Sequence, residues 1–244
     1  MRRRQLFGRA TLGAMTLALA GLSFPERGAA GPGAPPLKPP AKGKIRVAVL
    51  LSDGAQVIDF AGPWEVFQDV HVPGRGATMD ELMPFELFTV SSSTRPITAS
   101  GGLRVIPDYS YGHAPKASVI LVPAQDQGDP GHRKATTEWL IAASKEADVT
   151  MSVCTGAFVL GRAGMLDGLA ATTHVQALDQ FAAEFPKASL IRGVRFVENE
   201  KISSSAGLSA GIDLALRVVE RYWGRDIASL TASNLQYEGK GWIV

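Results

Sequence analysis

The sequence predicts a three-layer α/β sandwich, with a mostly parallel central β-sheet and helices on both of its faces. Short apolar runs rich in β-branched residues recur along the chain, which is typical of buried parallel strands. Segments with helical periodicity alternate with these runs, and that order places helices on both faces of a parallel sheet. The chain has 244 residues, of which 45% are hydrophobic and 20% charged, so it is large and apolar enough for one sizeable domain.

The strands are predicted where apolar residues run without interruption. The main strands are expected at residues 44–51, 85–90, 117–122 and 148–153, with a small hairpin at 102–107 and short strands at 195–197 and 201–203. The two last strands flank a polar Glu-Asn-Glu turn at residues 198–200.

The helices are predicted where apolar residues recur at helical spacing. They are expected at residues 60–70, 136–146, 157–163, 176–185 and 212–223. Pro63 suits the first turn of the first helix, where its missing N–H has no partner to lose. No internal repeat and no second domain are indicated.

The first thirty residues have the features of an export signal. Arginines precede an apolar stretch over residues 12–22, which is too short to span a bilayer, since spanning takes about 20 apolar residues. Residues 3–7 (RRQLF) resemble the twin-arginine signal of proteins that are exported after folding. Small residues at 28–30, and alternatively at 18–20, offer a cleavage site. We assign residues 1–30 to a signal peptide and expect a periplasmic or other extracytoplasmic location; the alternative is an uncleaved membrane anchor.

The charge balance changes once this segment is set aside. The whole chain has 25 Lys+Arg and 23 Asp+Glu, a net charge of +2, but residues 1–30 hold five of the basic and one of the acidic residues. The remainder has a net charge of −2 and no basic tract that would indicate nucleic-acid binding. Residues 31–43 are rich in proline and glycine and predict a stiff, exposed linker without a core. The folded domain is therefore assigned to residues 44–244.

Cys154 is the one cysteine of the sequence, which excludes an intrachain disulfide and a multi-cysteine metal centre. It follows the strand 148–153 at the carboxyl end of a parallel sheet, where open α/β sheets bind their ligands. A helix N-terminus lies next to it, so we expect the pKa of its thiol below the usual value of about 8.5. Gly156 permits a close approach of the backbone at this turn. The alternative is an inert, buried cysteine.

Residues 207–211 (GLSAG) match the G-x-S-x-G nucleophile elbow of serine hydrolases. The chain order contradicts that interpretation, because the catalytic histidine of that fold follows the serine and no histidine follows His174 here. The segment is therefore interpreted as a glycine-rich turn from a strand into a helix. The four histidines of the chain have no ligand spacing, so no metal is predicted.

Several stretches together resemble the ThiJ/PfpI superfamily, which has the fold of class I glutamine amidotransferases. In chain order they are residues 57–67 (VIDFAGPWEVF), 153–161 (VCTGAFVLG), 164–168 (GMLDG), 171–174 (ATTH) and 209–213 (SAGID). The resemblance runs from about Lys44 to Tyr237 and implies a flavodoxin-like arrangement of the three layers. It is strongest to isocyanide hydratases and to the sensor domain of AraC-type regulators. We expect no DNA-binding region of the kind those regulators carry, since the sequence ends at Val244.

The resemblance implies a catalytic pair. Asp59 matches the acidic residue that the family places beside the cysteine, and a carboxyl next to a thiol can share or transfer a proton. In a hydratase, Cys154 would attack the terminal carbon of an isocyanide. Asp59 would then move protons and guide the water that yields an N-substituted formamide. The alternative role of Asp59 is a helix N-cap ahead of Pro63, and Glu65 on the same helix is expected to be structural.

Further residues are expected to border the substrate. The amide of Thr155 would face developing negative charge, as in an oxyanion hole. The family's second donor comes from a Pro-Gly-Gly turn, where this sequence has Ala124 and Gln125 in place of the glycines, and other residues do not reach the backbone angles of glycine as readily. His174 lies twenty residues after the cysteine, as in deglycase-like members; the alternative is a structural histidine. Peptidase-like members carry histidine directly after the cysteine, where this chain has Thr155.

We therefore expect a cysteine-dependent hydratase or hydrolase of the isocyanide hydratase type, with a small-molecule substrate, no cofactor and no metal. One alternative is a glyoxalase or deglycase that acts on reactive aldehydes through the same cysteine. Another is a non-catalytic exported module in which Cys154 senses redox state or the domain binds a ligand. No nucleic-acid partner and no stable membrane insertion after processing are expected, and the resemblance implies a homodimer.

Overall fold

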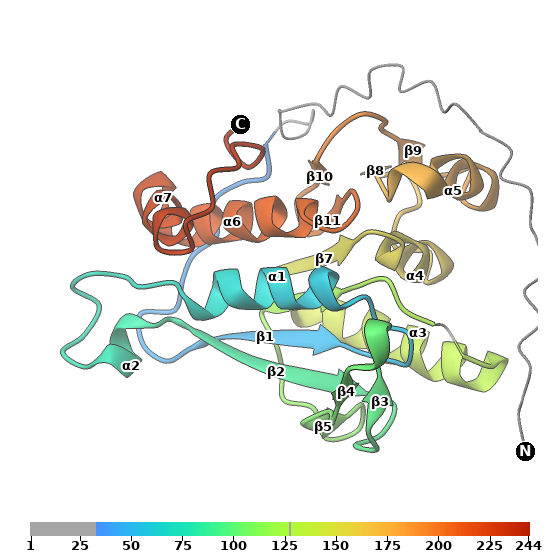
Figure 1. Cartoon of the computed structure of the whole chain (residues 1–244), viewed down its shortest axis with the longest axis horizontal. Helices are drawn as coiled ribbons and strands as arrows, with labels where there is room; N and C mark the ends of the chain where they lie inside the picture. The colour runs from blue at the N-terminus through green and yellow to red at the C-terminus, as the bar shows by residue number, and fades with distance from the viewer. Residues whose placement is uncertain (1–32, 127) are drawn as a thin grey trace, which may run out of the picture.

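The computed structural model describes residues 33–126 and 128–244, so the predicted signal peptide at residues 1–30 lies outside the described residues. The described chain folds into a three-layer α/β sandwich (Figure 1), which confirms the predicted fold class. Its central sheet has seven strands in the order β10-β11-β7-β6-β1-β2-β5. Neighbouring strands are parallel throughout except β10 and β11, which are antiparallel.

The centre of the sheet is formed by the apolar runs that the sequence indicated: β1 (Ile45–Leu50), β2 (Phe85–Ser91), β6 (Val119–Val122) and β7 (Val149–Val153). Along β1, Val47 and Val49 belong to the core cluster on one face, and Ala48 and Leu50 to the cluster on the other. Both faces are covered, so these strands need apolar residues at every position rather than at alternate ones.

The remaining strands are short: β3 (Ile97–Thr98), β4 (Arg104–Val105), β5 (Tyr109–Ser110), β8 (Ala170–Ala171), β9 (Ser189–Leu190), β10 (Phe196–Glu198) and β11 (Ile202–Ser205). The predicted hairpin is the antiparallel pair of β3 and β4. The predicted strands around the polar turn are the antiparallel pair β10 and β11, of which β10 forms the edge of the sheet and β11 also pairs with β7. The sequence did not indicate β5, β8 or β9, because two residues are too few to show a period.

Helices cover both faces of the sheet, as Figure 1 shows. One face carries α1 (Val57–Gln68), α6 (Ala210–Trp223) and α7 (Arg225–Asn234); the other carries α3 (Pro130–Glu146), α4 (Gly156–Arg162) and α5 (Leu178–Glu184). Outside these layers lie α2 (Met79–Leu82) and the 3₁₀ turns η1 (Ser100–Gly102) and η2 (Val175–Ala177). None of the helices in the described chain is long and apolar enough to cross a membrane.

Helix α1 begins three residues earlier than the sequence predicted, and this changes the place of two residues. Its N-cap is Gln56, so Asp59 lies within the first turn and is not the N-cap that was one of its predicted roles. Pro63 lies in the interior of the helix instead of its first turn. Since Pro63 has no N–H to donate, the backbone carbonyl of Asp59 lacks its usual helical partner.

Most residues of the proline-rich segment 33–43 are exposed, as the sequence predicted, but the segment also contacts the domain. The N–H of Leu37 donates to the carbonyl of Arg221 (2.7 Å), and Nε of Arg221 donates to the carbonyl of Pro35 (3.0 Å). The side chain of Leu37 also packs against the core beneath α1 and α6. A stiff proline-rich chain loses little conformational entropy on docking, which makes such contacts favourable.

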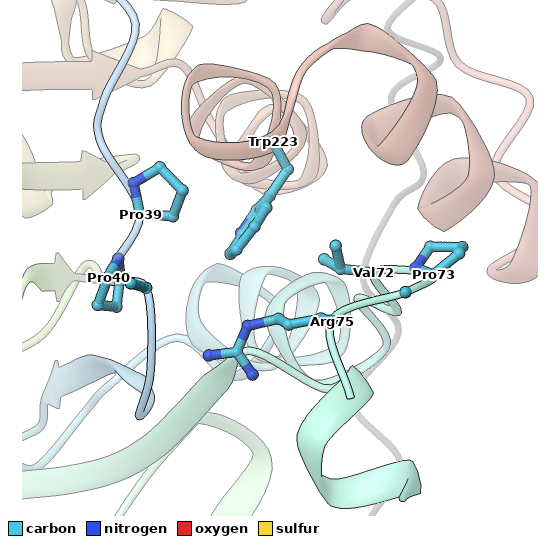
Figure 2. Close-up of a pocket in the computed structure, with 8 residues that line it drawn as sticks. Pro39, Pro40, Val72, Pro73, Arg75 and Trp223 are labelled. Carbon is cyan, nitrogen blue, oxygen red and sulfur yellow. The ribbon is translucent and has the colours of Figure 1, made fainter. Parts of the chain in front are cut away.

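The same segment continues past the end of α6. Figure 2 shows the side chain of Trp223 pointing into the space between Pro39 and Val72, with the guanidinium of Arg75 close to it. The guanidinium carbon of Arg75 lies 5.8 Å from the centre of the Trp223 ring, a cation–π distance. The predicted linker thus contacts the domain at Leu37 and beside Trp223, while most of its described residues stay exposed.

Candidate active site

Cys154 occupies the turn between β7 and α4 and has a φ of +59°, in the left-handed region that non-glycine residues rarely adopt. Its N–H donates to the carbonyls of Ser205 (3.2 Å) and Ala206 (3.0 Å). Its own carbonyl accepts a hydrogen bond from Oγ1 of Thr173 (2.9 Å). The strained backbone is thus held by hydrogen bonds from both sides, which is how such conformations persist at functional sites.

Gly156 follows in the first turn of α4 and meets the expectation of a close approach. A Cβ at this position would lie 2.1 Å from the carbonyl oxygen of Val122, at the end of β6. No side chain fits there, because the obstacle is backbone that cannot rotate away. This contact sets the depth at which the turn with Cys154 lies against the sheet.

Asp59 lies beside Cys154, at the start of α1, and is completely buried. Its Oδ2 accepts the N–H of Ala124 (3.2 Å). Its Oδ1 is buried and completes no hydrogen bond of ordinary geometry with the described residues. The thiol of Cys154 and the backbone N–H of Leu208 face this carboxyl group. The structure therefore brings the two residues of the predicted pair together and leaves one carboxyl oxygen free to take a proton.

Burial dominates the protonation of both groups. It raises the pKa of Asp59 to about 6, against the opposing effects of the Ala124 hydrogen bond and of the Cys154 thiol and Leu208 N–H that face the carboxyl group. Burial and then the negative charge of Asp59 raise the pKa of Cys154 to about 11. The prediction of a lowered thiol pKa is therefore wrong. The N–H and hydroxyl of Thr155 do favour the thiolate, but loss of hydration and the neighbouring carboxylate outweigh them.

The predicted oxyanion donors are already engaged in this structure. The N–H of Thr155 faces the sulfur of Cys154, and the N–H of Ala124 donates to Asp59 and is not free for a substrate oxygen. The Oε1 of Gln125 accepts a hydrogen bond from Oγ of Ser52 (3.1 Å). Neither Ala124 nor Gln125 has a positive φ, so this turn does not need the glycines of the family's pattern.

His174 lies at the edge of the site. Its Nδ1 accepts the N–H of Gln176 (3.3 Å), and its ring packs on Gly207, where a Cβ would lie 2.0 Å from Cδ2 of the ring. These contacts are those of a structural histidine that borders the turn after β11. Glu65 is exposed and pairs with Nε2 of Gln68 (2.6 Å), outside the site.

The G-x-S-x-G segment forms a strand-to-helix turn, as interpreted from the sequence. Ser209 is exposed, and its Oγ accepts a hydrogen bond from Nη2 of Arg195 (3.3 Å). The residue with positive φ is Leu208, at +58°. Gly211 is needed for packing, because a Cβ there would lie 2.9 Å from Cγ2 of Val153.

Sequence reasoning missed two contributors, the backbone of Leu208 and the hydroxyl of Thr173. Both lie in stretches that matched the family or a catalytic motif, but a sequence does not show where a main-chain N–H or a side-chain hydroxyl points. The described residues contain no group of three or more His, Cys, Asp or Glu that could hold a metal ion.

Known proteins share this architecture. The chain is 28% identical over 194 residues to isonitrile hydratase of Pseudomonas putida, an alignment that covers 79% of this chain and 78% of that protein. It is 27% identical over 212 residues to the HTH-type transcriptional regulator GbdR of Pseudomonas aeruginosa, which covers 84% of this chain but 54% of the regulator. The chain thus spans about half the length of that regulator.

The crystal structure of a THiJ/PfpI family protein from Pseudomonas syringae has the same fold. It superposes with a TM-score of 0.68 at 26% identity and covers 82% of this chain and 78% of that one. The sequence model of the DJ-1/PfpI family matches residues 45–221, which is well over half of the sequence. The protein that carries the buried Cys154–Asp59 pair is therefore a member of the DJ-1/PfpI family.

Proposed function

We propose that the protein is a hydratase that adds water to a small isocyanide, with Cys154 as nucleophile and Asp59 as proton carrier. The observation that carries the proposal is the buried contact between Asp59 and Cys154 at the carboxyl edge of the sheet. The similarity to isonitrile hydratase along most of both chains supports it.

The reaction balances with these two residues and water. The sulfur of Cys154 forms a bond to the terminal carbon of the isocyanide, and the thiol proton passes through Asp59 to the same carbon, which yields a thioimidate. Water then adds to that carbon and gives one proton to the nitrogen. The carbon–sulfur bond breaks, sulfur recovers a proton, and an N-substituted formamide leaves. The net change is isocyanide plus water to formamide.

The electrostatics of the site suit such a relay. At neutral pH the thiol of Cys154 keeps its proton, so a proton is available where the new bond forms. The pKa of Asp59 is about 6, close to neutral pH, so its carboxyl group can both accept and return a proton. Thr155 directs an N–H and a hydroxyl at the sulfur and so stabilises the thiolate as it develops.

A second candidate is a ligand-binding domain without turnover. It is favoured by the similarity to a transcriptional regulator over about half of that regulator's length. In that case the pair would bind or sense a small molecule. Both candidates take a small molecule at the same site, and they differ in whether product forms.

The test is to incubate the chain from residue 31 onward with an aryl isocyanide and to quantify the formamide by chromatography. The proposal expects turnover by the wild type, a loss on the order of 1,000-fold in Cys154→Ser and about 100-fold or more in Asp59→Asn. Methylglyoxal serves as the substrate of the glyoxalase alternative. Absence of both products with folded wild-type protein would overturn the enzymatic proposal in favour of the binding domain.

We further propose that residues 1–30 direct the protein out of the cytoplasm and that the mature chain forms a homodimer. The twin-arginine pattern at residues 3–7 supports export. A precursor with Arg3→Lys and Arg4→Lys is expected to stay in the cytoplasmic fraction, and export of that variant would contradict the proposal. Light scattering coupled to size exclusion tests the dimer, and a monomeric mass would exclude it.

A further inference from the structure

We propose that Arg195 is a positioning residue for the Cys154–Asp59 pair, because it clamps both ends of the turn at residues 206–209. The inference rests on the proposed function only for its effect on turnover. Its structural consequence can be measured without any substrate.

The clamp joins the two ends of the turn through different parts of Arg195. The backbone carbonyl of Arg195 accepts the N–H of Ala206 (2.8 Å), and its Nη2 donates to Oγ of Ser209 (3.3 Å). Between these two points the turn contacts both residues of the pair. The carbonyl of Ala206 accepts the N–H of Cys154 (3.0 Å), and the N–H of Leu208 faces the carboxyl group of Asp59.

Arg195 is itself held by a buried carboxylate. Its Nε donates to Oδ2 of Asp213 (2.6 Å), which lies in the first turn of α6 and is completely buried. The other oxygen of Asp213 accepts the hydroxyl of Tyr237 (3.1 Å). The chain also passes close by at Gly241, where a Cβ would lie 2.9 Å from Oδ2 of Asp213. The C-terminal segment thus packs around the anchor of the clamp.

The turn needs such a clamp because it is strained and weakly packed. Leu208 has a φ of +58°, which costs an L-residue about 1–2 kcal/mol, and its side chain is 41% exposed. Packing of the leucine side chain therefore does little to hold this conformation. Strained residues persist where the surroundings over-determine them. Here the two contacts of Arg195 act together with the N–H of Cys154 on the carbonyl of Ala206 (3.0 Å) and the N–H of Gly211 on the carbonyl of Leu208 (3.1 Å).

The test is Arg195→Lys, which keeps the charge but replaces the planar fork, whose Nε and Nη2 contact Asp213 and Ser209, by a compact ammonium on a flexible stem that does not reproduce this geometry. A looser turn withdraws the N–H of Leu208 from Asp59, and that N–H lowers the pKa of the carboxyl group. We expect the pKa of Asp59 to rise by about 0.5 above its value in the wild type. Carboxyl ¹³C NMR measures it, with Asp59→Asn to assign the signal, and the acidic limb of kcat should move with it.

Arg217→Lys is the matched control. Arg217 donates from Nη2 to the buried Glu198 (3.0 Å) and lies on the same helix as Asp213, but its ion pairs are with Glu198 and Glu220, outside the turn. The control is expected to lose stability and to leave the pKa of Asp59 unchanged. An equal shift in Arg217→Lys would overturn the proposal, because the effect would then follow from general loosening of the fold.

Tyr237→Phe is the second, milder variant, since it removes one hydrogen bond to Asp213 and keeps the ring. It is expected to raise the pKa of Asp59 by less than Arg195→Lys does, and it decides the question if Arg195→Lys does not fold. If the pKa of Asp59 stays unchanged in both folded variants, Arg195 is not a positioning residue. If the pKa rises as expected but the wild type forms no formamide, the proposed function fails and the clamp stands.

Discussion

Two neighbouring parallel strands, β7 and β11, end in turns that are alike in backbone and different in chemistry. Each turn leads into a helix and contains one non-glycine residue with positive φ, Cys154 at +59° and Leu208 at +58°. In the first turn the strained residue is buried and carries a thiol against the carboxyl group of Asp59. In the second it is an exposed leucine, and Ser209 beside it is exposed to solvent.

Since the strain is the same in both turns, the two differ in the buried carboxyl group that faces Cys154 and not in their backbone. The second turn contains the better-known sequence pattern, but its serine has an arginine as partner and no base. The first turn has no such pattern and holds the proposed nucleophile, Cys154. The second turn contributes main-chain groups to the first, so the two form one site with unequal roles.

The largest expected effect is the contrast between the two candidate nucleophiles. Cys154→Ser should abolish formamide formation, with a loss on the order of 1,000-fold or more in kcat/KM. Ser209→Ala should lower kcat/KM less than about 10-fold, because it removes one exposed hydrogen bond to Arg195. Steady-state kinetics of both variants measure this contrast. A loss in Ser209→Ala as large as that in Cys154→Ser would reverse the roles of the two turns.

The second expected effect concerns the glycines that let the turns pack. Gly156→Ala should cost more than about 3 kcal/mol or prevent folding, because its Cβ meets the backbone carbonyl of Val122. Gly207→Ala should cost about 1 kcal/mol, because its Cβ meets the ring of His174, which is partly exposed and can rotate. Urea unfolding of the two variants tests the order, and equal costs would contradict it.

The third effect is a dependence of stability on pH that comes from Asp59 beside the first turn. The pKa of Asp59 is raised to about 6 in the folded protein, so folding favours its protonated form. The contribution of this carboxyl group to the free energy of unfolding is fully present below pH 4 and is lost as the pH rises through 6. The side chain of Asp59→Asn does not ionise, so that variant does not lose this stability as the pH rises. The free energy of unfolding of Asp59→Asn relative to wild type should therefore rise by about 3 kcal/mol between pH 4 and pH 8.

Urea unfolding of wild type and Asp59→Asn at both pH values measures this change. Asp213→Asn is not a suitable comparison, because it would leave Arg195 without its buried partner. A constant difference between the two proteins across this pH range would show that Asp59 has an ordinary pKa, and the relay would lose its basis.

The smallest effect comes from relieving the strain of the second turn. Leu208→Gly should raise the free energy of unfolding by no more than about 1 kcal/mol, since relief of about 1–2 kcal/mol of backbone strain is partly offset by the flexibility of glycine in the unfolded chain. Thermal unfolding at pH 7 measures it. A loss of more than 1 kcal/mol would show that the leucine side chain is packed and that the turn does not depend on the clamp.

The sequence predicted the layers well because apolar runs and helical periods are local signals. The strand before Cys154 and most of α1 followed from such patterns, although the predicted helix began after Asp59, and the resemblance paired the two residues. The raised pKa of Cys154 could not be predicted, because it depends on burial and on a charge that only the folded chain brings near. For the same reason the sequence did not predict that Leu37, in a proline-rich segment expected to be an exposed linker, contacts α6.

The pH dependence of Cys154 alkylation tests the central claim, the coupling of Asp59 and Cys154, most directly. Initial rates with iodoacetamide, measured from pH 6 to 11.5 in wild type and Asp59→Asn, report the thiol pKa. We predict a pKa of about 11 in the wild type and a lower one in Asp59→Asn, because that variant removes the neighbouring negative charge while burial remains. The same pKa in both proteins would contradict the account.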